Sequence, residues 1–397
     1  KFFKGKACET AKGMITLHKM DGRVYFEIPL ALMGREMLMG STISEITNNG
    51  FGSVGEKPKG LLYISFVRCD SVISLKQLTA QYDTNEENLK QRIKESTIPA
   101  TIKNFKITTY NEDSTAVVID MTDYLVSADE AINPFSPWAP ILAGGERVME
   151  KEFRRENSQV VSIKAFEDNV SVKSSLTYGL SLKNKVMYIF QREPFTAVMT
   201  RSFILLPEHP MRPRLADPRI AIFSQGVSVF NGDSRGAQAR YYAQRWNLEP
   251  KDMEQYRKGV LTEPKKPIVF YVDNTFPENW KKYIKEGVEV WQMAFEKIGF
   301  KNAIVARDFP VDDVTFDPDN LKYSCVRYSP SWVANAMGPS WTDPRTGEII
   351  NASVYLYHNL VKMVQNWRFI QTGPADANVR KIVFDEETRV YPVCCVT

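Results

Sequence analysis

Histidine, cysteine and carboxylate side chains could hold a catalytic metal, and the three histidines of this chain are far apart. They are His18, His209 and His358. A catalytic zinc needs three protein ligands, an open position for water and a nearby carboxylate that takes a proton from that water. None of the three histidines has another histidine four residues away, so no helix presents two imidazoles on one face. The spacing therefore predicts no metal ligand and no catalytic residue in this chain.

Other catalytic patterns give no stronger candidate. No Gly-x-Gly-x-x-Gly follows a predicted strand, and neither a Walker-type glycine loop nor a Gly-x-Ser-x-Gly elbow occurs. Carboxylates are plentiful, so a pair for glycoside hydrolysis stays open, although no pair stands out. The cysteines are odd in number and scattered, which predicts free thiols rather than a disulfide framework. They are Cys8, Cys69, Cys325, Cys394 and Cys395.

Length and charge limit the classes of protein that the chain can belong to. A chain of 397 residues predicts two to three domains. The 51 basic and 47 acidic side chains are interspersed, which gives no basic stripe for nucleic acid. The chain has no apolar run of about 18 residues, so we expect no membrane span. It opens at Lys1 without an apolar segment, and we therefore expect any targeting segment to be absent from this sequence.

The first two thirds of the chain predict mostly strands. Residues 1–50 form an N-terminal hairpin region, in which Asp21-Gly22 turns one strand into the next and His18 is expected to face solvent. Residues 29–39, rich in Leu and Met, are expected to form a short helix. Residues 51–262 predict a β-rich accessory domain, because short apolar runs alternate with polar turns. Within it we expect one charged helix at residues 85–94, a connector at 207–262 and a polar helix at 238–246.

From residue 263 onwards the pattern becomes that of an α/β domain. An apolar strand at residues 267–272 precedes a helix with apolar side chains every three or four positions between Trp280 and Ile298. Strands follow at 303–306 and 322–327, so the first three elements predict a right-handed βαβ unit. Residues 337–357 then read as a loop, a turn at Asp343 to Gly347 and a strand at 349–357.

Three segments resemble an exported bacterial family of zinc-dependent metalloproteases. They are Met337 to Tyr357, Val269 to Pro277 and Pro210 to Arg219, and the resemblance runs from about Cys8 to about Asp376. The family places a metzincin-like catalytic domain after two poorly characterised N-terminal domains. The resemblance thus implies an α+β multidomain protein, with β-rich N-terminal and middle domains followed by the N-terminal (upper) half of a metzincin-like α/β domain at 263–397. It also implies secretion or an envelope location, zinc in the complete protein, and a peptide or protein substrate.

The chain departs from the family at the zinc signature. Members carry His-Glu-x-x-His-x-x-Gly-x-x-His downstream of the segment that matches Tyr357 to Asp376, and this sequence ends at Thr397 without it. A shifted reading frame, a shortened sequence and a natural non-catalytic product all stay open. We therefore expect this chain to be inactive, to need no cofactor itself, and to self-associate through an uncovered half-domain.

Substrate positioning is what the resemblance still implies for this chain. In metzincin-like proteases an edge strand above the cleft pairs with an extended peptide through backbone hydrogen bonds. The matching positions are Asn351, Ala352, Ser353 and Val354. A second hypothesis is a non-catalytic envelope module that binds peptide or protein through the β-rich domain and this strand. Chelator-sensitive cleavage of casein, or its absence, separates the two.

Overall fold

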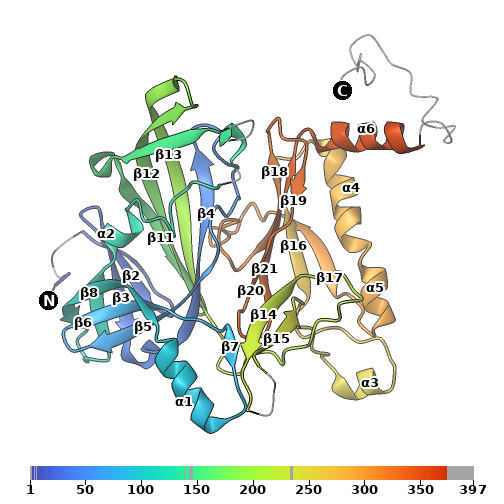
Figure 1. Ribbon diagram of the computed structural model, residues 1–397, viewed down its shortest axis with the longest axis horizontal. Helices are drawn as coiled ribbons and strands as arrows, with labels where there is room; N and C mark the ends of the chain where they lie inside the picture. The colour runs from blue at the N-terminus through green and yellow to red at the C-terminus, as the bar shows by residue number, and fades with distance from the viewer. Residues whose placement is uncertain are drawn as a thin grey trace.

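The protein is β-rich, contains few helices and is built as more than one domain. The computed structural model describes residues 2–3, 5, 7–137, 139–142, 146–232 and 236–372. Figure 1 shows a β-rich unit on the left and an α/β unit on the right, with the sheet of the second unit facing the first. In the described part of the chain, no helix is long and apolar enough to cross a membrane.

The β-rich unit is one strongly curved sheet. Among the described residues it has twelve strands in the order β1-β2-β3-β9-β8-β6-β5-β4-β13-β12-β10, with β11 paired to β12. Their bounds are β1 Glu9–Ala11, β2 Thr16–Met20, β3 Arg23–Pro29, β4 Glu36–Ile46, β5 Leu62–Cys69, β6 Val72–Gln77, β8 Ala100–Tyr110, β9 Ala116–Asp120, β10 Val148–Phe153, β11 Gln159–Ala165, β12 Asn169–Lys183 and β13 Tyr188–Leu205.

Residues 1–50 contribute strands β1 to β4 to this sheet, together with strands from later in the chain. The predicted hairpin is present, because β2 pairs with β3 across Asp21 and Gly22, whose φ angles of 52° and 74° suit the turn. However, β3 also pairs with β9, and β4 lies between β5 and β13 in the middle of the sheet. These pairings are long-range, so local patterns in the sequence did not reveal them.

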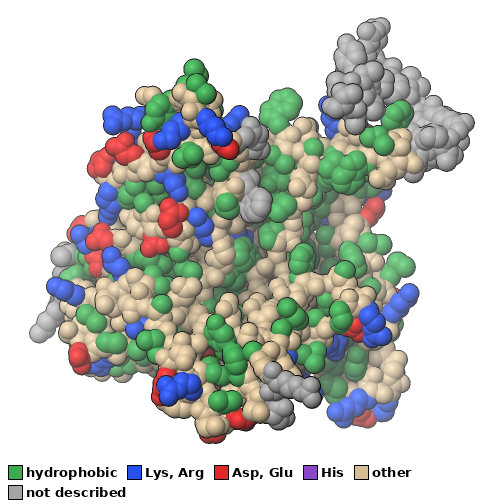
Figure 2. Space-filling model, viewed as in Figure 1, with side chains coloured by type: hydrophobic (Ala, Val, Ile, Leu, Met, Phe, Trp, Pro, Cys, Tyr) green, Lys and Arg blue, Asp and Glu red, His purple; other side chains and the backbone are tan. Residues whose placement is uncertain are grey.

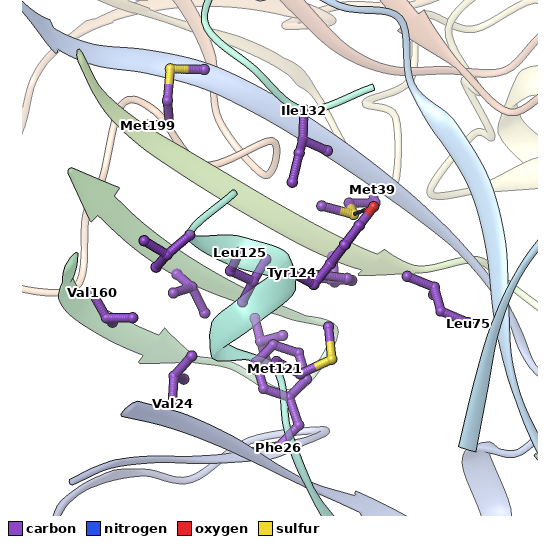
Figure 3. Packing of buried hydrophobic residues seen from close by; sticks show 14 of the residues in the cluster. Val24, Phe26, Met39, Leu75, Met121, Tyr124, Leu125, Ile132, Val160 and Met199 are labelled. Atoms are coloured by element: carbon purple, nitrogen blue, oxygen red, sulfur yellow. Dashed lines mark hydrogen bonds between the residues drawn. The ribbon is translucent and has the colours of Figure 1, made fainter. Parts of the chain in front are cut away.

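Apolar side chains from the inner surface of the sheet form the main core. Figure 3 shows Met121, Tyr124 and Leu125, from α2 (Thr122–Leu125) and the residue before it, pointing toward Phe26 and Met39 on the neighbouring strands. All five side chains are at most 2% exposed. Burying one large apolar side chain contributes roughly 1.5–3 kcal/mol, so this core stabilises the unit independently of any site.

Three local predictions for the β-rich unit and the connector are wrong. The expected helix at 29–39 is a 3₁₀ turn, η1 (Leu30–Leu32), followed by β4, whose apolar residues are buried on both faces. The expected helix at 238–246 is instead strand β15 (Gln238–Ala243). His18 is 7% exposed rather than solvent-facing, because Phe3 stacks on its ring and β1 pairs beside it. The charged helix is confirmed as α1 (Glu87–Ser96).

The connector carries a small sheet and a helix. Within the described residues this sheet has three strands in the order β15-β14-β7, formed by β14 (Ser224–Val229), β15 and β7 (Tyr82–Asp83). Helix α3 (Met253–Arg257) follows, with Asp252 as its N-cap. The remaining short helices are η2 (Pro140–Leu142) and η3 (Arg155–Asn157).

The α/β unit has a mixed sheet with helices on one side. Its described strands run in the order β17-β16-β18-β21-β19, with β20 also paired to β21. Strands β16, β17, β18 and β21 are parallel, whereas β19 and β20 run antiparallel to β21. The bounds are β16 Ile268–Val272, α4 Glu278–Glu289, α5 Gln292–Lys297, β17 Ile304–Asp308, β18 Ser324–Ser329, β19 Ala336–Met337, β20 Ser340–Thr342, β21 Ile349–Tyr357 and α6 Leu360–Thr372.

The predicted strand, helix, strand order of this unit is confirmed. The apolar stripe of α4 packs on the sheet, where Trp280, Ile284 and Val288 join a cluster with Val272 and Val326. The predicted single helix is in fact two helices, because the α-helical pattern is interrupted between α4 and α5. Residues 373–397, including Cys394 and Cys395, lie outside the described residues.

Candidate functional site: the β20–β21 hairpin and the domain interface

A tight turn places the candidate strand. Asp343 is fully buried, and its backbone carbonyl accepts hydrogen bonds from the N–H groups of Thr346 (3.2 Å) and Gly347 (2.9 Å). Gly347 adopts a φ of 77°, and a Cβ there would lie 2.7 Å from the carbonyl oxygen of Ala243. Only glycine fits both conditions. The predicted turn and the strand at 349–357 are thus confirmed in position.

The prediction that this strand is an edge strand is wrong. β21 pairs with β18 on one side and with β19 and β20 on the other. The sequence pattern showed an apolar strand after a turn but did not reveal that residues 336–342 fold back along it. Among the described strands, β19 is therefore the outer one in this half of the sheet.

The four candidate substrate-binding residues lie inside the protein. Asn351 is 0% exposed, and its Nδ2 donates to the carbonyl oxygen of Tyr323 at 2.7 Å. The backbone N–H of Ala352 donates to Oγ of Ser324 at 3.0 Å. Ser353 is 4% exposed, whereas Val354 points to the opposite face and packs in the cluster beneath α4. Their polar groups already have partners within the chain, so they hold the sheet together.

Ion pairs that the sequence did not reveal occupy the interface between the two units. The guanidinium of Arg327 on β18 donates to Oδ2 of Asp273 at 3.2 Å and to Oδ1 of Asp319 at 2.9 Å. Lys173 from β12 in the β-rich unit lies 3.6 Å from Asp319. Burial alone would raise the pKa of Asp319, but Arg327 and Lys173 outweigh it and hold that pKa below its usual range. The network therefore joins the two units as charged, mutually satisfied groups.

Lys57 approaches the same interface from the other unit. Its ammonium donates to Oγ of Ser353, and Ser353 in turn donates to Oδ1 of Asn351 at 3.1 Å. Desolvation lowers the pKa of Lys57 to about 8. A serine beside a lysine with such a pKa has the components of a nucleophile and its base. Because Ser353 is buried between two domains, the geometry supports a structural contact rather than an exposed catalytic pair.

The loop that delivers Lys57 has the spacing of a nucleotide-binding motif. Gly50, Gly52 and Gly55 follow β4, which corrects the prediction that no such pattern follows a strand. The chain then runs into β5 without a helix, so the loop presents no helix N-terminus to a phosphate. A Cβ at Gly55 would lie 2.9 Å from Cγ of Arg327. This glycine therefore permits close packing of the two units.

His18 and His358 have separate local partners, and His209 is exposed. Nε2 of His18 lies 2.9 Å from a carboxylate oxygen of Glu27. The ring of His358 stacks on Trp280, with ring centres 5.5 Å apart, and its Nδ1 lies 2.9 Å from the hydroxyl of Tyr328. In the part of the chain that the structure describes, no group of three or more His, Cys, Asp or Glu residues could hold a metal. No zinc ligand is therefore assigned among the described residues, and the zinc that the resemblance implies for the complete protein stays a prediction.

Together the fold and the site describe a β-rich multidomain protein whose second unit is a mixed α/β sheet. Comparison with protein families gives two matches, each to a domain of unknown function. Residues 57–251 match the family model named DUF5117, and residues 1–46 match the one named DUF5118. Comparisons with curated proteins and with solved structures gave no match. The matched segments cover the β-rich unit and most of the connector, whereas the α/β unit lies outside both.

Proposed function

We propose that the chain supplies the accessory domains and the substrate-binding sheet of a secreted zinc metallopeptidase. The sequence resemblance is the starting point, and the arrangement of the α/β unit supports it. The unit has the order strand, helix, strand, strand, antiparallel outer strand, which is the order expected for the upper half of a metzincin-like domain. The described residues contribute binding and positioning, and no zinc ligand is assigned among them.

The observation that carries the proposal is the antiparallel outer strand. The carbonyl oxygen of Asn335 accepts a hydrogen bond from the N–H of Tyr357 at 3.4 Å. The carbonyl oxygen of Pro339 accepts one from the N–H of Ser353 at 3.0 Å. Because alternate residues of a strand direct their backbone groups to opposite sides, the intervening Gly338 directs its N–H and carbonyl away from β21. Gly338 is exposed, and no described strand pairs beyond β19. An extended peptide would add here, at residues 336–342, by backbone hydrogen bonds.

The experiment offers casein and extended casein peptides to the purified chain and measures both binding and cleavage. The proposal expects peptide binding by the purified chain without cleavage, in the presence or absence of added zinc. Cleavage that a chelator abolishes would overturn the inactivity of this chain and would make it a metallopeptidase by itself. Failure to bind any extended peptide would contradict the assignment of the outer strand.

A non-catalytic peptide-binding module is the second candidate function. The same outer strand supports it, because β-strand addition captures a peptide without any chemistry. The two candidates differ in what a longer polypeptide containing this sequence would do. Zinc-dependent cleavage by that polypeptide supports the peptidase, whereas binding alone supports the module.

A further inference from the structure

A cavity of about 370 Å³ lies between the two units, at the amino ends of the parallel strands. Asp168 and Ile204 line it from the β-rich unit, Trp246 from the connector, and Tyr271 and Tyr323 from the α/β unit. Its volume falls within the range of roughly 300–1,000 Å³ that is typical of small-molecule sites. The cavity is distinct from the outer strand β19, because none of residues 336–342 lines it.

Glu348 lines one wall of the cavity, and one oxygen of its carboxylate has no partner among the described residues. Oε2 of Glu348 is buried and has no hydrogen-bond partner among the described residues. The side chain of Asn247 hydrogen-bonds to the Glu348 carboxylate, and desolvation raises the pKa of that carboxylate above its usual value. Buried polar atoms are rarely left unpaired, so this oxygen is placed to accept a hydrogen bond from a bound donor.

Positively charged side chains lie at the rim of the cavity. Lys266 and Arg307 line the cavity and are exposed, and Lys266 lies close enough to Glu348 to interact electrostatically with its carboxylate. Lys322, by contrast, is paired with Asp168 at 3.4 Å. The cavity thus offers a carboxylate with one unpaired oxygen, two exposed cations and aromatic side chains in its walls. Arginine is well suited to holding a carboxylate through a planar pair of hydrogen bonds.

We propose that this cavity binds a small zwitterion, an amino acid or dipeptide with an apolar or aromatic side chain. Its ammonium group donates to Glu348, its carboxylate meets Arg307 and Lys266, and its side chain packs among Trp246, Tyr271 and Ile204. This inference does not rest on the proposed peptidase function, because it concerns a different site and is measured by binding without turnover.

Isothermal titration with four probes tests the proposal on the full chain. Phenylalanine and glycylphenylalanine carry both charges, N-acetylphenylalanine lacks the ammonium, and phenylalaninamide lacks the carboxylate. The zwitterions are expected to bind, and each blocked form is expected to bind at least about tenfold more weakly.

Glu348→Gln should remove the preference for a free ammonium, and Arg307→Gln should remove the preference for a free carboxylate. Lys94→Gln, on the exposed helix α1, is the matched control and should bind as the native chain does.

Three results would overturn the proposal. They are the absence of zwitterion binding, equal binding of the blocked forms, and unchanged selectivity in both cavity variants. Arg307 is exposed, so its variant is expected to fold even if Glu348→Gln perturbs the interface. Peptide capture at residues 336–342 is expected to be unchanged in both variants, because these residues do not line the cavity, and this keeps the outcome separate from that of the proposed function.

Discussion

At the scale of single residues, the two units are joined by charged side chains with several partners each. Arg327 binds Asp273 and Asp319 inside the α/β unit, and Lys173 of the β-rich unit lies 3.6 Å from Asp319. Removing one partner of a buried ion pair typically costs about 3–5 kcal/mol, because the other charge is left uncompensated. We therefore regard these residues as the contacts that fix the orientation of the α/β sheet on the β-rich unit.

Lys57 gives the interface a dependence on pH. Its pKa is about 8 in the folded protein against a usual value of 10.5. Below pH 8 Lys57 is protonated in both the folded and the unfolded chain. The free-energy cost of burying this cation then lowers the stability of the folded protein by its full amount. Between pH 8 and 10.5 the folded chain has released the proton while the unfolded chain still binds it. The free energy of unfolding therefore rises with pH over this range.

Lys57→Met removes that cost at every pH. We expect the variant to be more stable than the native chain at pH 7, by about 1–3 kcal/mol, and the difference to shrink by pH 10. Urea unfolding of both proteins at the two pH values measures it. The same difference at pH 7 and pH 10 would show that Lys57 keeps its usual pKa in the folded protein.

Arg345 links the turn at Asp343 to the β-rich unit. Its guanidinium donates to both oxygens of Asp343, to Glu36 at 2.5 Å and to the carbonyl of Pro207 at 3.2 Å. A lysine cannot reproduce this planar set of donors, so Arg345→Lys should lower the free energy of unfolding by about 1–3 kcal/mol. Chemical denaturation measures the change.

The chain contains a matched control for that substitution. Asp217-Pro218-Arg219 repeats the Asp-Pro-Arg sequence and the same fork, but its arginine side chain is 86% exposed. Arg219→Lys should therefore change stability by less than about 0.5 kcal/mol. Equal losses in the two variants would mean that the local fork, rather than the contact with the β-rich unit, is what matters.

At the scale of elements, α4 depends on one apolar stripe. Ile284 is half-buried in the cluster beneath the helix, whereas its neighbour Tyr283 is 68% exposed. Ile284→Ala is expected to destabilise the protein by about 1–3 kcal/mol, since it removes contacts with the sheet. Tyr283→Ala should change stability by less than about 0.5 kcal/mol. Thermal unfolding of the pair checks the orientation of the helix, and the reverse order of effects would contradict it.

The elements differ in how well the sequence predicts them. The α4 stripe, the hairpin at Asp21 and the turn at Asp343 depend on neighbours within a few residues, and their positions were predictable. Pairing between distant segments was not, because nothing local indicates that residues 336–342 cover β21 or that β4 lies at the centre of a sheet. The candidate residues 351–354 were located correctly on a strand but assigned to the wrong environment for this reason.

Charged interface residues were missed for a related reason. Lys57, Asp273 and Arg327 are far apart in the chain, and each alone resembles an ordinary surface charge. One signal was available, since Gly50, Gly52 and Gly55 lie just before Lys57 and indicate close approach of a loop to another surface. The identity of that surface depends on the tertiary fold.

At the scale of the whole molecule, apolar side chains are exposed around α6. Figure 2 shows hydrophobic side chains beside this helix and the adjoining strands. Trp332 is 91% exposed, Trp367 is 55% exposed and Val364 is 51% exposed. A neighbouring cavity of about 410 Å³ is lined by Met363 and Trp367 among other residues. Such surfaces commonly associate with another protein surface.

The purified chain is therefore expected to self-associate as its concentration rises. Val364→Lys together with Trp367→Lys should weaken the association at least tenfold, because charges would be placed on the contact surface. Sedimentation velocity over a range of concentrations measures it. A native chain that stays monomeric throughout, or a double variant that associates equally well, would contradict the expectation.

The central claim is that the backbone of residues 336–342 captures an extended peptide, and Gly338 offers the most direct measurement. A Cβ at this position would meet only Val354 Cγ2, at 3.7 Å, so the space beside Gly338 accommodates the Cβ of alanine. Alanine keeps the outward N–H, whereas proline removes it. Fluorescence anisotropy with a labelled casein peptide should show near-native binding for Gly338→Ala and at least about tenfold weaker binding for Gly338→Pro. Equal binding by both variants would contradict the claim.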